Sequence, residues 1–391
     1  MADSRTAVLV AAVIVISGGP YVAVASAETA AAPRATGTAE VHERAGAAGW
    51  QGTPVRVEPL PAAIRLAGAG ASWSLRYLST SWNGRRTTVS GTLSLPSGRP
   101  PRDGWPVVSF GHGFGGSADA CAPSVTGPSP WERAVQEQLI GAGYAVAVTD
   151  FEGIGTPGES PGIDGRAEAH TMVDIVRAAR RIAPVSRSWA SVGYSLGGHA
   201  ALFTGALAAA YAPSLRHVGT IAMAPTTQWR VQTSGPAFRD PVRQVNHTIP
   251  YTGRSLALTR PGFRVADWYT PKGQELVDLA GRICVTEMLQ TVAGVTNGDV
   301  LKDPPAADDE FARALADEEI PVMRYPKPVY IVHGADDELP VTLSEMTAGQ
   351  LAGASSDVTF VPVPGVDHIT LLPAVAGRVR EWADRLFAHA P

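Results

Sequence analysis

A serine stands between glycines at the point where a strand-like segment gives way to a helical one. Ala190–Tyr194 is short and apolar, as a buried strand would be, and Leu196–Ala210 has helical apolar spacing. In a nucleophile elbow the serine occupies a strained turn, and glycines such as Gly193 and Gly197 let strand and helix approach closely. The five-residue pattern also occurs in ordinary turns, so its place between strand and helix is what predicts Ser195 as a nucleophile.

An attacking serine also needs N–H donors for the oxyanion that forms. The backbone N–H of Leu196, at the start of the helix, is one candidate. The glycine-rich loop Gly111–Gly116 follows the apolar run Val107–Phe110, where a fold with such an elbow places its second donor. We assign this donor to Phe114, with Gly115 as its rival; a simple tight turn is the alternative interpretation of the loop.

The serine hydroxyl needs a base, which in this chain order follows the serine and an acid. His368 is the preferred histidine because Gly365-Val366-Asp367-His368 follows the last predicted strand, in a loop before the final helix. His199 lies one helical turn after the serine and should point away from it. A solvated loop histidine is the alternative for His368. The other histidines after the serine are His217, His247, His333 and His389.

The acid should follow the penultimate strand, where His333–Pro340 supplies three carboxylates. Asp337 fits the Gly-x-x-Asp spacing of such acids. Asp336 stays open as the alternative, because the interval from Asp337 to the following proline is one residue short. Asp367 is expected to be solvated. Asp150 precedes the serine, so we expect it to fix the glycine-rich turn after it.

The segments that must position these residues alternate between strand and helix. Apolar runs rich in Val, Ile and Ala suit strands of a parallel sheet that is covered on both faces by helices, an α/β fold. Ligands in such folds bind at the carboxyl ends of the strands, where the candidate residues fall. The predicted strands are Arg86–Leu95, Val107–Gly111, Ala145–Asp150, Ala190–Tyr194, Val218–Ala224, Val329–His333 and Val358–Val363, and the predicted helices are Trp131–Ala142, Ala169–Ile182, Leu196–Ala210, Leu343–Ala352 and Leu372–Ala388.

One long stretch breaks this alternation. Residues 226–324 contain helical pieces and irregularly placed Pro, Trp and Tyr, but no series of strands. The stretch is longer than any ordinary connection, so we expect a mainly helical cap inserted over the active site. Residues 53–225 and 325–391 would then form the catalytic domain. Trp229, Phe263, Trp268 and Tyr269 could line an acyl pocket, although core of the cap is the commoner role for such residues.

The amino terminus has the features of an export signal. An apolar run, Ala7–Ile16, precedes Ala25-Ser26-Ala27, a small-x-small site suited to signal peptidase. We therefore expect residues 1–27 to be removed and the protein to be secreted; a retained membrane anchor is the alternative. Residues 28–52, rich in Ala, Thr and Gly, are expected to form a flexible lead-in.

The chain has two cysteines, Cys121 and Cys284. Export would permit a disulfide between them, and two free thiols are unusual in an exported protein. Neither lies beside a CxxC or a metal-type histidine spacing, so zinc is not expected.

Composition excludes some partners. The formal net charge of -4 offers no basic surface for nucleic acid, and 45% hydrophobic residues indicate a globular core. We expect a monomer that needs no cofactor and contacts a lipid interface only transiently.

The same residues carry a family resemblance over roughly Ala71 to Pro391. The chain resembles the α/β-hydrolase superfamily and, within it, the secretory lipase (lipase A-like) family. Its supporting segments are Cys121–Ser124, Gly143–Val146, Asp150–Gly153, Asp174–Ala179 and Tyr211–Leu215. The resemblance implies ester substrates with acyl chains and a lid between the sixth and seventh strands. The loop Gly113–Gly116 instead looks like the oxyanion loop of other bacterial lipases, and the lid sequence matches poorly, so chain-length preference does not carry over.

Together these observations predict a secreted serine ester hydrolase that acts on small-molecule or lipid esters through Ser195, Asp337 and His368. Two alternatives remain open at this point. The same three residues could cleave polyester or amide bonds, since pocket shape chooses the leaving group. A hydrolase fold could also serve as an inactive surface-binding protein.

Overall fold

The computed structural model describes residues 49–302 and 310–388, so the predicted export signal and most of the predicted lead-in lie outside the described residues. Its centre is one nine-stranded sheet with the order β1-β2-β3-β5-β4-β6-β7-β8-β9. The strands are β1 (Pro54–Pro59), β2 (Ala69–Thr80), β3 (Arg86–Pro96), β4 (Trp105–Gly111), β5 (Ala145–Thr149), β6 (Val185–Tyr194), β7 (Arg216–Met223), β8 (Val329–Gly334) and β9 (Val358–Val363).

The sheet has a parallel part and an antiparallel edge. Neighbouring strands from β5 through β4, β6, β7 and β8 to β9 are parallel, whereas β1, β2 and β3 pair antiparallel and β3 pairs antiparallel with β5. Every residue of β5 is buried, as expected for a strand covered on both faces. The sequence patterns located seven of the nine strands; β1 and β2 were not predicted.

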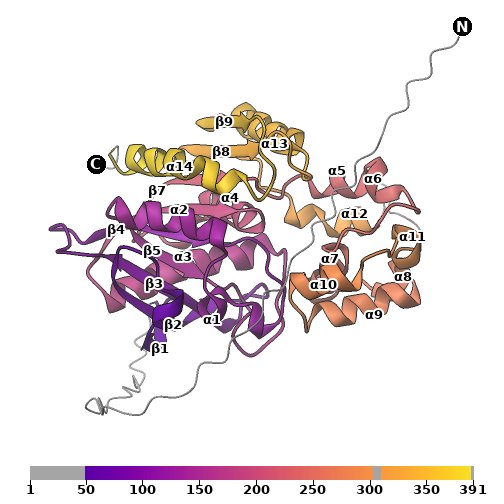
Figure 1. The fold of residues 1–391 in the computed structure, drawn as a ribbon, viewed down its shortest axis with the longest axis horizontal. Coiled ribbons are helices and arrows are strands. Elements are labelled where there is room, and N and C mark those ends of the chain that lie inside the picture. The colour runs from indigo at the N-terminus through magenta and orange to yellow at the C-terminus, as the bar shows by residue number, and fades with distance from the viewer. Residues whose placement is uncertain (1–48, 303–309, 389–391) are drawn as a thin grey trace, which may run out of the picture. The chain divides into compact units, whose positions relative to one another are not determined.

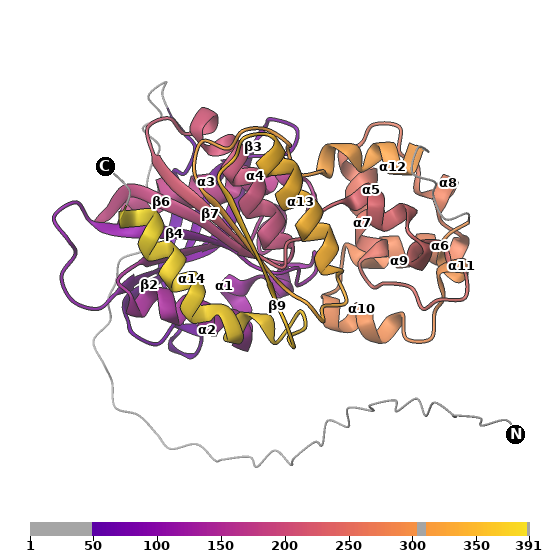
Figure 2. The same cartoon turned by 90° about the horizontal axis from the view of Figure 1, so that it is seen from above.

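Helices cover both faces of the sheet, as predicted for an α/β fold. On one face α2 (Pro130–Gly141) and α14 (Leu371–Ala388) share a hydrophobic core with β4–β8. On the other face lie α3 (Gly165–Ile182), α4 (Leu196–Tyr211) and α13 (Val341–Gly353). Figures 1 and 2 show the two helical layers with the sheet between them.

Between β7 and β8 the described chain forms helices and no strand of the sheet, which confirms the mainly helical insertion. They gather beyond one end of the sheet (Figures 1 and 2). These cap helices are α5 (Trp229–Ser234), α6 (Pro236–Arg239), α7 (Ile249–Thr259), α8 (Val265–Trp268), α9 (Pro271–Ala280), α10 (Val285–Thr291), α11 (Asn297–Val300), α12 (Glu310–Ala314) and the short 3-10 turn η3 (Ala316–Glu318).

The cap has its own hydrophobic core. Phe311 is buried, and the rings of Phe263, Trp268 and Tyr269 lie within 5.7–6.4 Å of it, centroid to centroid. These aromatic residues therefore serve as core of the cap. The same cluster includes Leu196, which follows the elbow serine, so cap and catalytic layers share packing there.

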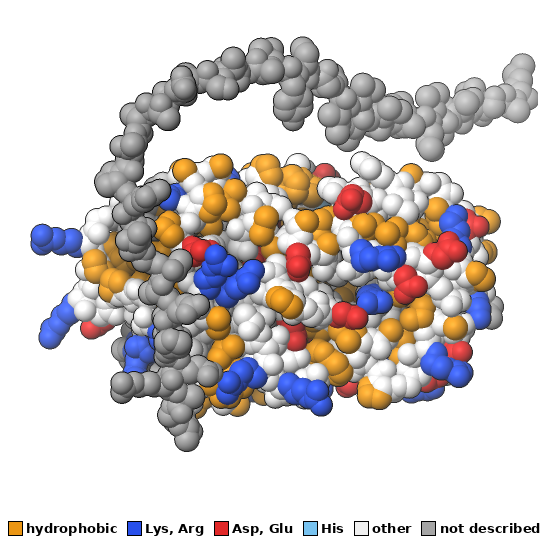
Figure 3. All heavy atoms as spheres, turned by 90° about the horizontal axis from the view of Figure 1, so that it is seen from below, with side chains coloured by type: hydrophobic (Ala, Val, Ile, Leu, Met, Phe, Trp, Pro, Cys, Tyr) orange, Lys and Arg blue, Asp and Glu red, His pale blue; other side chains and the backbone are white. Residues whose placement is uncertain are grey.

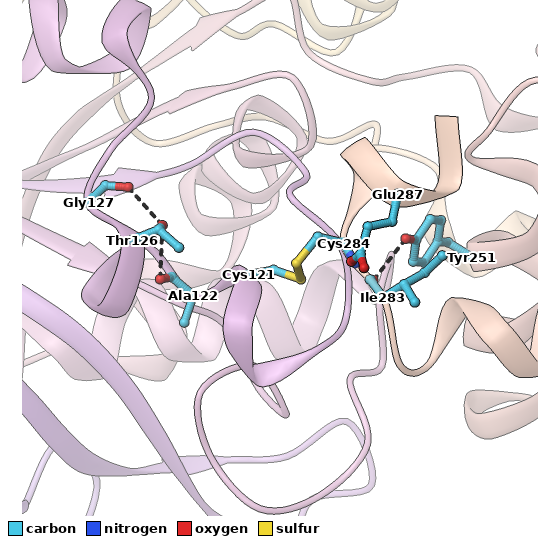
Figure 4. The surroundings of a disulfide bond; sticks show 8 residues. All are labelled: Cys121, Ala122, Thr126, Gly127, Tyr251, Ile283, Cys284 and Glu287. Atoms are coloured by element: carbon cyan, nitrogen blue, oxygen red, sulfur yellow. Dashed lines mark hydrogen bonds between the residues drawn. A yellow bond between two sulfur atoms is a disulfide. The ribbon is translucent and has the colours of Figure 1, made fainter. Parts of the chain in front are cut away.

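Cys121 and Cys284 form the predicted disulfide, at a sequence separation of 163 (Figure 4). Cys121 ends the 3-10 turn η2 (Asp119–Cys121), and Cys284 is the N-cap of α10 in the cap. On the cap side Tyr251 donates to the carbonyl of Ile283 at 3.0 Å, and Glu287 accepts the N–H of Cys284 at 3.0 Å. The bridge thus joins the cap covalently to the segment behind the glycine-rich loop.

No helix in the described ranges combines the length and apolar character needed to cross a membrane.

Replacing both cysteines, Cys121→Ser with Cys284→Ser, should lower the free energy of unfolding. The chain-entropy model gives about 4–5 kcal/mol for closing so long a loop, and measured losses are often smaller. Urea unfolding without reductant measures the loss. Dithiothreitol should weaken the wild-type protein to the level of the variant and leave the variant unchanged; equal stability of wild type and variant in the absence of reductant would contradict a structural bridge.

Candidate active site

Ser195 lies at the junction of β6 and α4 in a backbone conformation that non-glycine residues rarely adopt, with φ 55° and ψ -120°. Such a conformation costs on the order of 1–3 kcal/mol and persists only where its surroundings enforce it. Here the Ser195 N–H donates to the Met223 carbonyl at 2.9 Å, and the Ser195 carbonyl accepts N–H bonds from Gly198 and His199.

Two glycines make this junction sterically feasible. A Cβ at Gly193 would collide with the carbonyl of Gly197, and a Cβ at Gly197 would collide with the carbonyl of Gly111 at the end of β4. Strand β6, helix α4 and the start of the glycine-rich loop therefore meet backbone to backbone around the serine.

The structure brings Ser195, His368 and Asp337 together in a relay of hydrogen bonds. His368 Nε2 lies 2.9 Å from Ser195 Oγ, and His368 Nδ1 lies 2.7 Å from Asp337 Oδ2. Asp337 follows β8 and His368 follows β9, so both reach the serine from loops at the carboxyl ends of parallel strands. Tyr194 donates to the backbone carbonyl of His368 at 3.0 Å and holds that loop in place.

The geometry distinguishes Asp337 from its neighbour Asp336. The Asp337 side chain has no exposed surface, and its Oδ1 accepts the N–H of Leu339 at 2.8 Å. Asp336 is exposed and does not take part in the relay. Burial alone would raise the pKa of Asp337, but hydrogen bonds from His333 and His368 outweigh it and lower the pKa to about 2. Asp337 is consequently ionised at neutral pH.

His333 is a second histidine on the same carboxylate, a contact that sequence reasoning missed. Its Nε2 lies 3.1 Å from Asp337 Oδ2 and 2.9 Å from the Leu339 carbonyl, so this nitrogen carries the proton. Its Nδ1 then accepts the hydroxyl of Ser344 at 2.7 Å. The i, i+4 spacing of His333 and Asp337 was visible in the sequence, but the turn that bends them together was not.

Three backbone N–H groups are the candidates for the predicted oxyanion site. Within the described chain, the N–H groups of Phe114, Gly115 and Leu196 have no hydrogen-bond acceptor, so all three remain available to a ligand. The N–H of Gly113, by contrast, donates to Glu132 Oε1 at 2.8 Å. The choice between Phe114 and Gly115 stays a prediction.

The buried carboxylate of Glu132 was also missed. It caps α2 together with Ser129, whose hydroxyl donates to it at 2.6 Å, and its other oxygen holds the glycine-rich loop through Gly113. The signal was present as Ser129-x-x-Glu132, a capping-box pattern. The cap supports the same loop from the far side, where the Val285 N–H donates to the Gly115 carbonyl at 2.9 Å.

The remaining candidates lie outside the relay. Asp150 accepts the N–H of Ser124, so it fixes the segment after Cys121 and not the glycine-rich turn that we expected it to hold. In the turn after Asp150, Gly153, Gly155 and Gly158 adopt positive φ, a conformation that glycine reaches without steric cost. Asp367 is exposed and caps the turn to Thr370, while His389 lies outside the described residues.

His199 belongs to a buried polar network behind the serine. Its Nε2 lies 2.8 Å from the backbone carbonyl of Glu318 and must donate to it, while its Nδ1 lies 2.7 Å from Glu168 Oε2. One proton must therefore be shared between Nδ1 and Glu168. Arg260 of the cap pairs with the Glu318 carboxylate and lies 3.8 Å from Asp164.

The pKa shifts agree with this proton count. Burial raises the pKa of Glu168 to about 7 and that of Glu318 to about 8. Burial by itself would lower the pKa of His199, but the Glu168 carboxylate beside it raises that pKa overall. The folded protein thus holds protons that the unfolded chain releases.

Among residues 49–302 and 310–388, no cluster of three or more His, Cys, Asp or Glu side chains is arranged to hold a metal ion.

The mostly parallel sheet, its two helical layers and the serine at a strand–helix junction define an α/β-hydrolase. Residues 130–391 match the model of the secretory lipase family, and the chain belongs to that family. It is accordingly a hydrolase of the lipase and esterase kind.

The chain is also similar in sequence or structure to individual lipases and esterases. Lipase A of Moesziomyces aphidis is 25% identical over an alignment of 353 residues, and the match covers 82% of this chain and 73% of that protein. Candida antarctica lipase A in its closed state has a TM-score of 0.71 at 19% identity and covers 87% of this chain and 83% of its own. The rice cell wall degrading esterase LipA from Xanthomonas oryzae has a TM-score of 0.71 at 16% identity, over 87% of this chain and all (100%) of that one.

The proton held by His199 and Glu168 makes a testable contribution to stability. A folded-state pKa above the unfolded value stabilises at low pH, and this stabilisation is lost as pH rises through the folded pKa. The free energy of unfolding of the wild type minus that of Glu168→Gln should fall between about pH 5 and pH 8, by at most about 1.4 kcal/mol per pH unit for one proton. Urea unfolding of both proteins across this range measures it; a difference that is constant or rises with pH would contradict the shared proton.

Proposed function

We propose that the protein is a serine carboxylic-ester hydrolase in which Ser195 is the nucleophile, His368 the general base and acid, and Asp337 the residue that orients the histidine. The observation that carries this proposal is the unbroken relay from Asp337 Oδ2 through the imidazole to Ser195 Oγ, with distances of 2.7 and 2.9 Å. Membership of the secretory lipase family supports ester bonds as the substrate.

The relay can perform the reaction in two halves. His368 Nε2 takes the hydroxyl proton as Ser195 Oγ attacks the ester carbonyl, and Asp337 stabilises the imidazolium that forms. The N–H groups of Leu196 and of Phe114 or Gly115 stabilise the oxyanion, at about 3–4 kcal/mol per donor. The alcohol leaves with the proton from the imidazolium. Water then gives a proton to His368 as it attacks the acyl-enzyme, and His368 passes this proton to Ser195 Oγ as the acid leaves, which restores the free serine.

The structure around the relay suits a preorganised site. Phe114, in the glycine-rich loop, packs edge-on against Tyr251 of cap helix α7, with ring centroids 4.7 Å apart. His247, just before α7, has a pKa lowered by burial and by the nearby His368. The contact between Phe114 and Tyr251 joins the cap to the glycine-rich loop, and on this contact we infer that the cap restricts which esters enter.

We infer that the protein acts outside the cell after removal of residues 1–27. The family is described as secretory, and the long-range disulfide is of the kind that persists in oxidising surroundings. The mass of the amino terminus of the exported protein distinguishes cleavage from a retained anchor.

Ser195→Ala should lower kcat for p-nitrophenyl esters by roughly 10⁶-fold, because it removes the atom that forms the acyl-enzyme. Steady-state rates on p-nitrophenyl esters of increasing chain length, dissolved and emulsified, measure this and separate esterase from lipase preference. Circular dichroism confirms that the variant is folded. Activity retained in the folded variant would overturn the assignment.

Asp337→Asn should lower kcat by roughly 10⁴-fold, since an amide no longer fixes the imidazole in the tautomer that accepts the serine proton. Asp336→Asn is the matched control, with the same chemical change one residue away on an exposed side chain. It should change kcat less than about twofold, as expected for a surface substitution outside the relay. Equal losses in the two variants would contradict the role of Asp337.

A further inference from the structure

A second cleft lies at the opposite end of the sheet from the serine. It has a volume of about 1010 Å³ and is lined by the amino-terminal ends of β6 and β7, the chain just before β8, and the carboxyl-terminal ends of α3 and α4. Pockets that bind small molecules typically measure about 300–1,000 Å³, so this cleft is large enough for one. The reaction proposed above makes no use of it.

The charged side chains that line this cleft are mostly positive. Its walls carry Arg180, Arg187, Arg216 and Lys327 but a single carboxylate, Asp103. The chain as a whole has a net charge of -4, and on the face drawn in Figure 3 acidic and basic side chains are interspersed. The excess of positive side chains in this cleft therefore contrasts both with the negative net charge of the chain and with the mixed charges on that face.

Within residues 49–302 and 310–388 these cations have no carboxylate partners. No ion pair within the described ranges includes any of the four, and the buried Nε of Arg216 has no hydrogen-bond partner there. Their effect on neighbours is visible in the pKa values. Partial burial and then Arg187 lower the pKa of Arg180, while burial and then Lys327 lower the pKa of His217 to about 3. Positive charge that is not neutralised by carboxylates of the described chain attracts anions.

We propose that this cleft binds a phosphoryl-bearing anion with two or more negative charges. Guanidinium groups match the oxygens of phosphate in a bidentate arrangement, and Lys327 adds a point charge. A monocarboxylate could neutralise only one of the four cations. The hydroxyls of Ser186, Ser188 and Ser214, which also line the cleft, supply further donors to phosphoryl oxygens.

The anion site and the serine can be occupied together. Strand β6 begins in the cleft at Val185 and ends at Tyr194 beside the nucleophile, a length of ten residues. At about 3.3 Å per residue the two sites are roughly 30 Å apart. The anion is therefore not the ester substrate, and its binding does not depend on the proposed hydrolysis.

Titration calorimetry with inorganic tripolyphosphate at low salt tests the site, with saturable binding as the expected result. Arg187→Gln combined with Lys327→Gln should weaken the affinity at least about tenfold, since each change removes a charge-assisted contact. Arg378→Gln with Arg385→Gln is the matched control: it removes the same charge from exposed positions on α14 and should leave the affinity within about twofold. Ester hydrolysis at the wild-type rate in both double variants shows that the fold is intact and keeps this test separate from that of Ser195.

Vesicles distinguish the sources of the phosphoryl group. Sedimentation with vesicles of phosphatidic acid, whose phosphomonoester headgroup carries up to two negative charges, but not with phosphatidylcholine vesicles, blocked by tripolyphosphate, identifies a lipid headgroup. Tripolyphosphate binding without sedimentation identifies a soluble phosphoryl ligand. Absence of saturable tripolyphosphate binding, or equal loss of affinity in the cleft variant and the control variant, would overturn the proposal.

Discussion

The positive φ of Ser195 is the constraint on which the rest of the site depends. A non-glycine residue keeps this conformation only if its neighbours hold it, and here they do so by close backbone packing. Gly193, Gly197 and Gly111 lack the Cβ atoms that would push strand, helix and loop apart. Leu196 is the first residue of α4, and within the described chain its N–H has no hydrogen-bond acceptor. The same close packing thus fixes the positions of Ser195 and of the Leu196 N–H, the groups to which we assign nucleophilic attack and oxyanion stabilisation.

The other elements bring their groups to this fixed point. Parallel pairing puts the ends of β8 and β9 at the same edge of the sheet as the end of β6, so Asp337 and His368 arrive from two loops. Hydrogen bonds then fix each group in place. His333 and Leu339 donate to the Asp337 carboxylate, and Tyr194 donates to the backbone carbonyl of His368. The glycine-rich loop is supported by Glu132 on one side and by the disulfide-linked cap on the other. Preorganisation of this kind lets dipoles act on developing charge without rearranging.

Much of this was predictable because short-range chemistry leaves a sequence signal. The elbow glycines, the Val- and Ala-rich strands and the two cysteines each identified their feature, and the helical cap followed from the break in alternation. Strand β2 was missed although Trp73, Leu75 and Tyr77 alternate with polar residues and pair with β3. The supporting roles of His333 and Glu132, and the cationic cleft, depend on which distant segments the sheet brings together, so residue spacing alone did not reveal them.

The most direct test of the central claim is covalent labelling by a fluorophosphonate, followed by digestion and mass mapping of the adduct. We expect one phosphonyl group per chain on the peptide that contains Ser195, with labelling lost in His368→Ala. An adduct on a different residue, or no adduct on a folded protein, would contradict a nucleophile at the β6–α4 junction and favour a hydrolase fold that binds without catalysis.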